Sequence, residues 1–121
     1  MELITTAIAL ELSKQAINPI IKSIEKEYGE KTKELLKAGI KKVLQKFSLK
    51  KEEVVLIETE IVEANTSILT DENKFLEFFE NNNKIQELMR KIEKREPNIN
   101  IVIEKSYNEF LIDGNNNSIT F

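Results

Sequence analysis

The stretch LMRKIEKREPNINIVIEK, residues 88–105, contains the point at which the sequence changes its hydrophobic period. Before Pro97, apolar residues recur at the three- and four-residue spacing of an amphipathic helix. After Pro97, isoleucines occupy every second position, at 99, 101 and 103, which is the period of a strand. The two halves of this stretch therefore predict different secondary structures.

We accordingly divide the chain into a helical bundle domain, residues 1–96, and a strand-forming C-terminal segment, residues 97–121. The predicted fold class is mainly α, a bundle of four or five helices followed by a short C-terminal β segment. That segment is either a hairpin or a cross-β motif. A chain of 121 residues buries one modest core and little of a second.

Glycine, proline and serine residues set the first helix boundaries. Apolar spacing continues from Leu3 to Tyr28, with a kink or break expected at Asn18-Pro19 and Gly29 as the C-terminal cap. A second helix is predicted over residues 30–47, and Ser48 is predicted to cap a third helix.

The remaining helices are predicted from apolar stripes and polar caps. The run VVLIETEIVE, residues 54–63, is rich in β-branched residues, but its length and its acidic first turn favour a helix. Thr70 or Asp71 is predicted to cap a short helix that ends at Asn81-Asn82-Asn83. The last helix is predicted to end before Pro97.

Composition excludes several classes of chemistry. The chain has no Cys and no His, so it lacks a thiolate and the commonest general base and transition-metal ligand. Its three glycines form neither a GxxxxGK[ST] nor a GxGxxG pattern. A net charge of −3 argues against nucleic acid as a partner. We therefore predict a protein that is not an enzyme and uses no cofactor or metal.

The N-terminal residues indicate a cytoplasmic location. MELITTAIALEL begins with an acid and has no basic leader, so no signal peptide is predicted. The apolar run from Leu3 to Leu10 is interrupted by Glu11 and Lys14, well short of the roughly 20 residues that span a bilayer.

Charge is unevenly distributed along the helical region. Residues 22–51 contain ten Lys and four Glu, a difference of +6, whereas residues 52–80 contain one Lys and nine acids, a difference of −8. One interpretation is two neighbouring helices with complementary solvent faces. The other is a cationic helix that binds anionic lipid headgroups. The headgroup residues would then be Lys33, Lys37, Lys41, Lys42 and Lys46.

The C-terminal stretch FLIDGNNNSITF, residues 110–121, has no charge after Asp113. One interpretation is a hairpin or three-strand meander that packs on the helical domain. The other is assembly with copies of itself, because neutral β-prone segments and asparagine ladders favour cross-β stacking. The residues expected to form the self-assembly or partner strands are Ile101, Ile103, Phe110, Ile112, Gly114, Asn115, Asn116, Asn117, Ile119 and Phe121.

The segment Gly114-Asn115-Asn116-Asn117-Ser118-Ile119 resembles the G-x-x-N-x-[hydrophobic] half of RHIM-like prion-forming motifs, which include bacterial amyloid signalling sequences. The other half of that motif, [IV]-Q-[IV]-G, is missing: the chain has Leu111-Ile112-Asp113-Gly114 there, with Asp113 in place of an apolar residue and no Gln. The helical region before it is similar in size and order to Bell domains, the bacterial counterparts of fungal HeLo domains.

This resemblance implies a cell-death effector of bacterial innate immunity and antiphage defence. A STAND or NLR-type NTPase receptor with a matching motif would template the tail into a homo-oligomer, which would be fibrillar. The helical domain would then move from the cytoplasm to the inner membrane. The membrane-inserting residues would be Leu3, Ile4, Ile8, Leu10 and Leu12, which otherwise form a buried core helix.

Two other functions remain open. The chain is alternatively a non-enzymatic adaptor, or antitoxin-like partner-binding module, whose C-terminal strands pair with a sheet in a heteromer or homodimer. It is otherwise a structural α+β domain that dimerises through its strand edge.

Overall fold

The computed structural model describes residues 3–94, and these residues form a helical bundle without strands. The mainly α fold is therefore confirmed for this part of the chain. The predicted β segment lies outside the described residues. In chain order the elements are α1 (Leu3–Glu11), the π-helical η1 (Leu12–Ile17), the 3₁₀ segment η2 (Asn18–Ile20), α2 (Ile21–Lys26), α3 (Glu30–Leu44), the 3₁₀ segment η3 (Gln45–Phe47), α4 (Lys51–Val62), α5 (Thr66–Leu69), α6 (Glu72–Asn81) and α7 (Asn83–Glu93).

The first helical run changes its winding at the predicted kink. Helix α1 continues into η1, and Pro19 lies in η2, directly before α2. Proline has no backbone N–H and its ring clashes with the preceding turn, so regular α-helical hydrogen bonding does not continue through it. The wide π turn and the tight 3₁₀ turn are the two irregular windings that precede and contain this proline.

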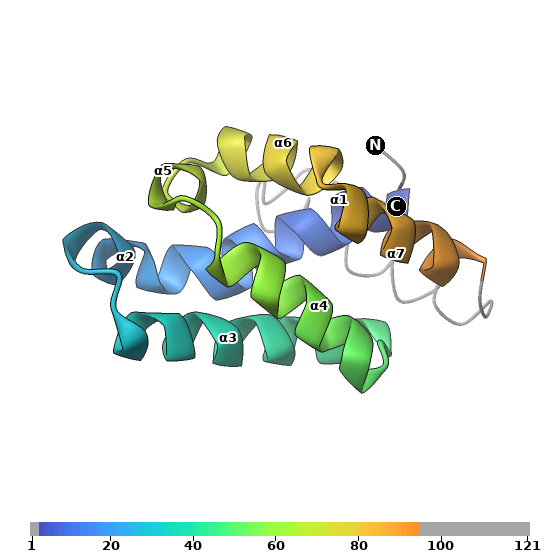
Figure 1. Ribbon diagram of the computed structural model, residues 1–121, viewed down its shortest axis with the longest axis horizontal. Coiled ribbons are helices and arrows are strands. Elements are labelled where there is room, and N and C mark those ends of the chain that lie inside the picture. The colour runs from blue at the N-terminus through green and yellow to red at the C-terminus, as the bar shows by residue number, and fades with distance from the viewer. Residues whose placement is uncertain (1–2, 95–121) are drawn as a thin grey trace, which may run out of the picture.

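Helices lie on both sides of this first run (Figure 1). Helix α3 lies along one edge of the molecule and packs against η1. Helix α6 lies along the opposite edge and packs, with α7, against α1. Helix α4 contacts both α3 and α7. The largest fully buried side chains are Ile8, Leu12, Leu36, Ile40, Leu44, Phe47, Ile57, Ile61, Leu69, Phe75, Phe79 and Ile85.

The predicted cap at Gly29 is wrong. Helix α2 ends at Lys26, and Glu27 is extended with φ −160° and ψ 114°. Gly29 is the N-cap of α3, with φ −103° and ψ −168°, which is not the left-handed conformation of a C-terminal glycine cap. The chain leaves the helix early because Tyr28 turns toward α4, where its hydroxyl donates a 2.6 Å hydrogen bond to the Val62 carbonyl.

The predicted N-cap at Ser48 is also wrong. Ser48 ends η3 in the left-handed conformation, with φ 57° and ψ 39°. Helix α4 begins three residues later, and Lys50 is its N-cap. The Lys50 backbone N–H donates a 2.7 Å hydrogen bond to the Glu53 carboxylate. Glu53, three residues after the N-cap Lys50, therefore fixes the start of α4. Its hydrogen bond is the one in a capping box that runs from the N-cap backbone to the side chain three residues later.

Asparagine and aspartate cap the later helices. The Asp71 carboxylate accepts a 3.1 Å hydrogen bond from the Lys74 N–H, which confirms the predicted start of α6. Helix α5, which was not predicted, begins at the cap Asn65, whose side chain accepts from the Ser67 N–H at 2.9 Å. Side-chain oxygens thus satisfy backbone donors that have no partner within their own helix.

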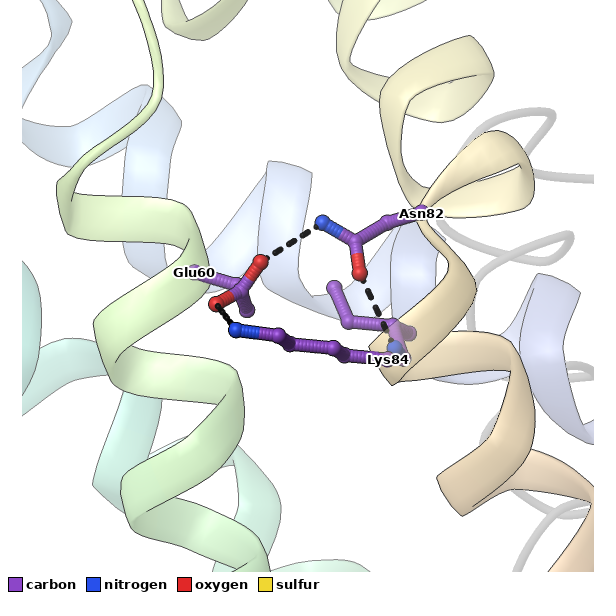
Figure 2. A network of polar contacts seen from close by, with 4 residues as sticks. Glu60, Asn82 and Lys84 are labelled. Atoms are coloured by element: carbon purple, nitrogen blue, oxygen red, sulfur yellow. Dashed lines mark hydrogen bonds and ion pairs between the residues drawn. The ribbon is translucent and has the colours of Figure 1, made fainter.

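Asn82 joins three helices at one corner of the bundle (Figure 2). Its carbonyl oxygen accepts a 3.0 Å hydrogen bond from the Ile85 N–H and so caps α7. Its amide donates a 2.9 Å hydrogen bond to the Glu60 carboxylate on α4, and the Lys84 ammonium lies 3.8 Å from the other Glu60 oxygen. The predicted break at Asn81-Asn82-Asn83 is therefore confirmed, and it also links α4 to the α6–α7 turn.

Candidate functional site

The outer surface of α3 and η3 carries the best candidate site. Four of the five lysines predicted to bind lipid are exposed on it: Lys37, Lys41, Lys42 and Lys46. We call this set the α3 lysine face. Because successive residues of a helix are about 100° apart, Lys37 and Lys41 form one row and Lys42 and Lys46 form another. Both rows point away from the core residues on the same elements, such as Ile40 and Val43.

Lys33 does not belong to this face. It is half-buried, and its ammonium lies 5.3 Å from the centre of the Tyr28 ring. A cation over an aromatic ring is attracted by the ring's negative face. The extended turn that precedes α3 brings Tyr28 under Lys33, so this lysine already has a partner within the bundle.

The α3 lysine face makes no ion pairs within the described residues, although Glu34 and Glu58 line one surface depression with Lys37 and Lys41. Within residues 3–94, none of its four ammonium groups pairs with a carboxylate. Glu30 and Glu34 are the acids of α3, against five lysines on the same helix. A solvated surface on which cations outnumber acids attracts anionic groups from solution. Its chemistry suits phosphate-bearing headgroups better than a single small anion, because the charges are spread along a helix rather than gathered in a pocket.

The residues predicted to insert into a membrane lie mostly in the core. Ile4, Ile8 and Leu12 are 2%, 0% and 0% exposed, and Leu10 is half-buried. Leu3 differs, because 51% of it is exposed. Insertion therefore requires these side chains to leave the bundle, and it stays a prediction. None of the helices within residues 3–94 combines the length and the apolar composition needed to cross a membrane.

Within residues 3–94, buried polar side chains lie along the first helical run, on α3 and on α4. Glu11 and Ser13 are buried, and the Thr5 hydroxyl, also buried, has no hydrogen-bond partner in the described part of the chain. In residues 3–94, no three acidic, histidine or cysteine side chains form a group that holds a metal. The prediction that the chain is not an enzyme stays a prediction.

Val55 is an exposed apolar residue that sequence reasoning missed. It is 49% exposed, whereas its neighbour Val54 is 7% exposed. The buried stripe of α4 includes Val54, Ile57 and Ile61, and Val55 lies about 100° away from Val54 around the helix. This angular offset from the buried stripe is the feature of the sequence that could have predicted the exposure of Val55. The cationic residues Lys41 and Lys51 line the same surface depression as Val55.

The predicted strand residues, from Ile101 to Phe121, lie outside the described residues. No protein-family model, curated protein or solved structure matches the chain.

Proposed function

We propose that this chain is a self-assembling effector of bacterial defence that binds anionic membrane through the α3 lysine face. A STAND or NLR-type receptor gathers copies through residues 97–121, and the gathered helical domains act on the inner membrane and kill the cell. The observation that carries this proposal is the set of four exposed lysines, Lys37, Lys41, Lys42 and Lys46, without carboxylate partners among residues 3–94.

The energetics explain why assembly is required. A lysine near an anionic membrane surface contributes about 1 kcal/mol, so one copy gains about 4 kcal/mol. That free energy corresponds to a dissociation constant of about 1 mM, so a single copy dissociates readily from the membrane. Copies held together bind by avidity, which raises the overall affinity by about two to four orders of magnitude.

Headgroup binding precedes any insertion of α1 in this proposal. Burying a side chain such as Ile4, Ile8 or Leu12 contributes about 1.5–3 kcal/mol each. Withdrawing all three thus costs an amount comparable with the whole stability of a small domain, roughly 5–15 kcal/mol. A single copy remains folded at the membrane surface, and many adjacent copies supply the free energy for a later step.

Vesicle flotation tests the proposal, because assembled protein rises with the lipid only when it is bound. Full-length protein, before and after its assembly, is mixed with vesicles of phosphatidylglycerol or of phosphatidylcholine alone. Changing the α3 lysine face to Gln at all four positions is expected to abolish binding of the assembled protein to phosphatidylglycerol. A control with the same net charge changes four exposed lysines elsewhere: Lys22, Lys26, Lys74 and Lys91. Equal binding by the two variants would refute the lysine-face proposal.

A non-enzymatic adaptor is the second candidate, and a specific observation favours it. Within residues 3–94, the α1 residues Ile4, Ala7 and Ile8 are buried in the core, so α1 has a role in the bundle that needs no membrane. An adaptor would form a complex of fixed stoichiometry through its C-terminal strands and would bind neither kind of vesicle. Expression in bacteria with forced clustering separates the candidates, because only the effector arrests growth.

A further inference from the structure

A shallow apolar groove lies beside the α3 lysine face. It is lined by Lys41, Gln45, Leu49, Lys51, Val54 and Val55 and has a volume of about 360 Å³. We call it the Val55 groove. Half of the Val55 side chain is accessible, and Leu49 is half-buried, so the groove offers apolar surface to another segment. Its charged residues are both cationic.

A second groove serves as a comparison. It lies along α5 and α6, has a volume of about 570 Å³, and is lined by Ile68, Lys74, Glu77, Phe78, Asn81 and Asn82. We call it the Ile68 groove. Its one cation and one acid cancel, whereas the charged residues that line the Val55 groove are two lysines. The charges of the two linings therefore favour an acidic segment in the Val55 groove over the Ile68 groove.

Residues 104–121 of the same chain have the complementary chemistry. They contain three acids, Glu104, Glu109 and Asp113, and one base, Lys105, a difference of −2. The run Phe110-Leu111-Ile112 is apolar and is flanked directly by two of the acids. An apolar triplet flanked by carboxylates is complementary in chemistry to a groove lined by leucine, valine and two lysines.

The length of chain permits this contact without strain. Helix α7 ends at Glu93, and 16 residues, from 94 to 109, separate that end from Phe110. At most about 3.3–3.6 Å per residue, such a stretch reaches roughly 50 Å, which exceeds the diameter of a small domain. Tethering also keeps the segment at an effective concentration of about 1 mM, so a weak contact suffices.

We propose that residues 109–113 of the same chain occupy the Val55 groove before assembly, with Glu109 and Asp113 near Lys41 and Lys51. This inference rests on the proposed function and adds its resting state. Lys41 belongs both to the groove and to the α3 lysine face. Docking therefore occupies a headgroup lysine and withholds the assembly strand at the same time. Recruitment of the tail into an assembly frees both.

Cysteine alkylation tests this docking in the full chain, without lipid or receptor. Because the chain has no cysteine, Val55→Cys gives a single reporter in the groove and Asn73→Cys gives one at an exposed position of α6. Maleimide is expected to alkylate Val55→Cys about tenfold more slowly in the full chain than in the chain ending at Lys94. A dissociation constant of about 0.1 mM for the docked segment, at an effective concentration of about 1 mM, gives this degree of protection. Asn73→Cys is expected to react equally in both chains.

Charge exchange identifies the partners. Adding Lys41→Glu and Lys51→Glu is expected to remove the protection of Val55→Cys, and further adding Glu109→Lys and Asp113→Lys is expected to restore it. The matched control, Lys31→Glu with Lys42→Glu, changes the net charge equally and keeps the protection.

Three results would overturn the inference. Equal alkylation of the full and shortened chains means that the tail does not cover the groove. Protection that increases with protein concentration assigns the groove to a second copy. Protection lost equally in the control variant assigns the effect to net charge. Because no membrane is present, a failure of lipid binding leaves this measurement unaffected.

Discussion

Gly39 of α3 faces Ala16 of η1 so closely that a Cβ built on Gly39 would lie 3.3 Å from both the Cα and the Cβ of Ala16. This contact joins α3 to the irregular part of the first helical run. The glycine is needed for close approach rather than for an unusual dihedral angle, because it lies inside a regular α-helix.

Gly39→Ala is therefore expected to lower the free energy of unfolding by about 1 kcal/mol. Alanine gains about 1 kcal/mol of helix propensity, but overpacking against a backbone atom costs about 1–3 kcal/mol. Urea unfolding of the full chain measures the difference. Gly29→Ala is the comparison without overpacking, because its Cβ would meet only Glu27 Oε1, at 3.9 Å, and any loss there comes from the poorer N-cap of α3. A stabilised Gly39→Ala variant would show that η1 moves aside.

Tyr28 is expected to make the bundle sensitive to alkaline pH. Burial raises the pKa of Tyr28 above its ordinary value of 10.0, because the phenolate would lose solvation. The unfolded chain then releases the proton at lower pH than the folded chain. The stability from this group is complete below pH 10 and is lost as the pH rises from 10.0 through the higher folded pKa.

Tyr28→Phe is expected to cost about 1 kcal/mol at neutral pH, since the hydrogen bond to the Val62 carbonyl is lost, and to weaken the alkaline loss. Thermal unfolding between pH 7 and pH 11 measures both effects. Tyr107→Phe is the matched control, because Tyr107 is the other tyrosine of the chain and lies outside the described bundle. The same alkaline slope in Tyr28→Phe and the parent would contradict this assignment.

Asn82→Ala is expected to destabilise the bundle by about 1–2 kcal/mol, because it removes the cap of α7. It also removes the amide that donates to Glu60 (Figure 2). Lys84→Ala is the control. Its ion pair with Glu60 spans 3.8 Å and its side chain is 70% exposed, so its loss should cost less than about 0.5 kcal/mol. Denaturant unfolding compares the two variants, and equal losses would mean that the cap is unimportant.

Asn82→Asp separates the two roles of Asn82. Aspartate retains the acceptor for the Ile85 N–H but has no donor for Glu60 and places a second negative charge beside it. We expect a loss smaller than that of Asn82→Ala at low pH, where the carboxyls are protonated, and a larger relative loss at neutral pH. Identical effects of Asp and Ala at every pH would contradict this division.

The periodic features of this fold were predictable, and the contact-dependent features were not. Leu36, Ile40 and Val43 repeat at helical spacing, and α3 forms where that repeat predicts a helix. The caps at Gly29 and Ser48 were predicted wrongly, because tertiary contacts and a competing acid decided where those helices begin and end. Helix α5 has four residues, too few to show a hydrophobic period.

The candidate site shows the same division. The rows of lysines follow from helical spacing alone, but the removal of Lys33 from the face depends on Tyr28, which the extended turn brings beneath it. For Leu3 to Leu12, a core helix and an inserting helix have the same apolar pattern. Hydropathy does not distinguish burial against α6 and α7 from burial in lipid.

Single lysine variants are expected to show that residues of the α3 lysine face bind the membrane and that Lys33 does not. Lys37→Gln should weaken binding of the assembled protein to anionic vesicles, with a loss of about 1 kcal/mol for each copy in contact. Lys33→Gln should weaken it little, and should instead cost about 0.5–1 kcal/mol of stability through loss of the Tyr28 contact.

Salt provides the second measurement for this pair. Binding should fall steeply between 0.1 M and 1 M salt, where the Debye length shortens from about 10 Å to about 3 Å. Vesicle flotation across this range, together with thermal unfolding, compares the two variants. Equal losses of lipid binding in the two variants would mean that Lys33 also binds headgroups. That result would contradict the assignment of its ammonium to the Tyr28 ring.

A synthetic peptide of residues 97–121 is expected to assemble into cross-β fibres at neutral pH, with reflections near 4.7 Å and about 10 Å. Asp113→Asn should shorten the lag before assembly, because stacked copies no longer place like charges next to one another. Changing Gly114 or Asn117 should abolish the reflections, since each removes a feature of the G-x-x-N pattern. Fibre diffraction and dye binding measure these outcomes. If the peptide stays soluble at every concentration and Asp113→Asn makes no difference, the tail is an ordinary docking strand, and the adaptor function replaces the effector.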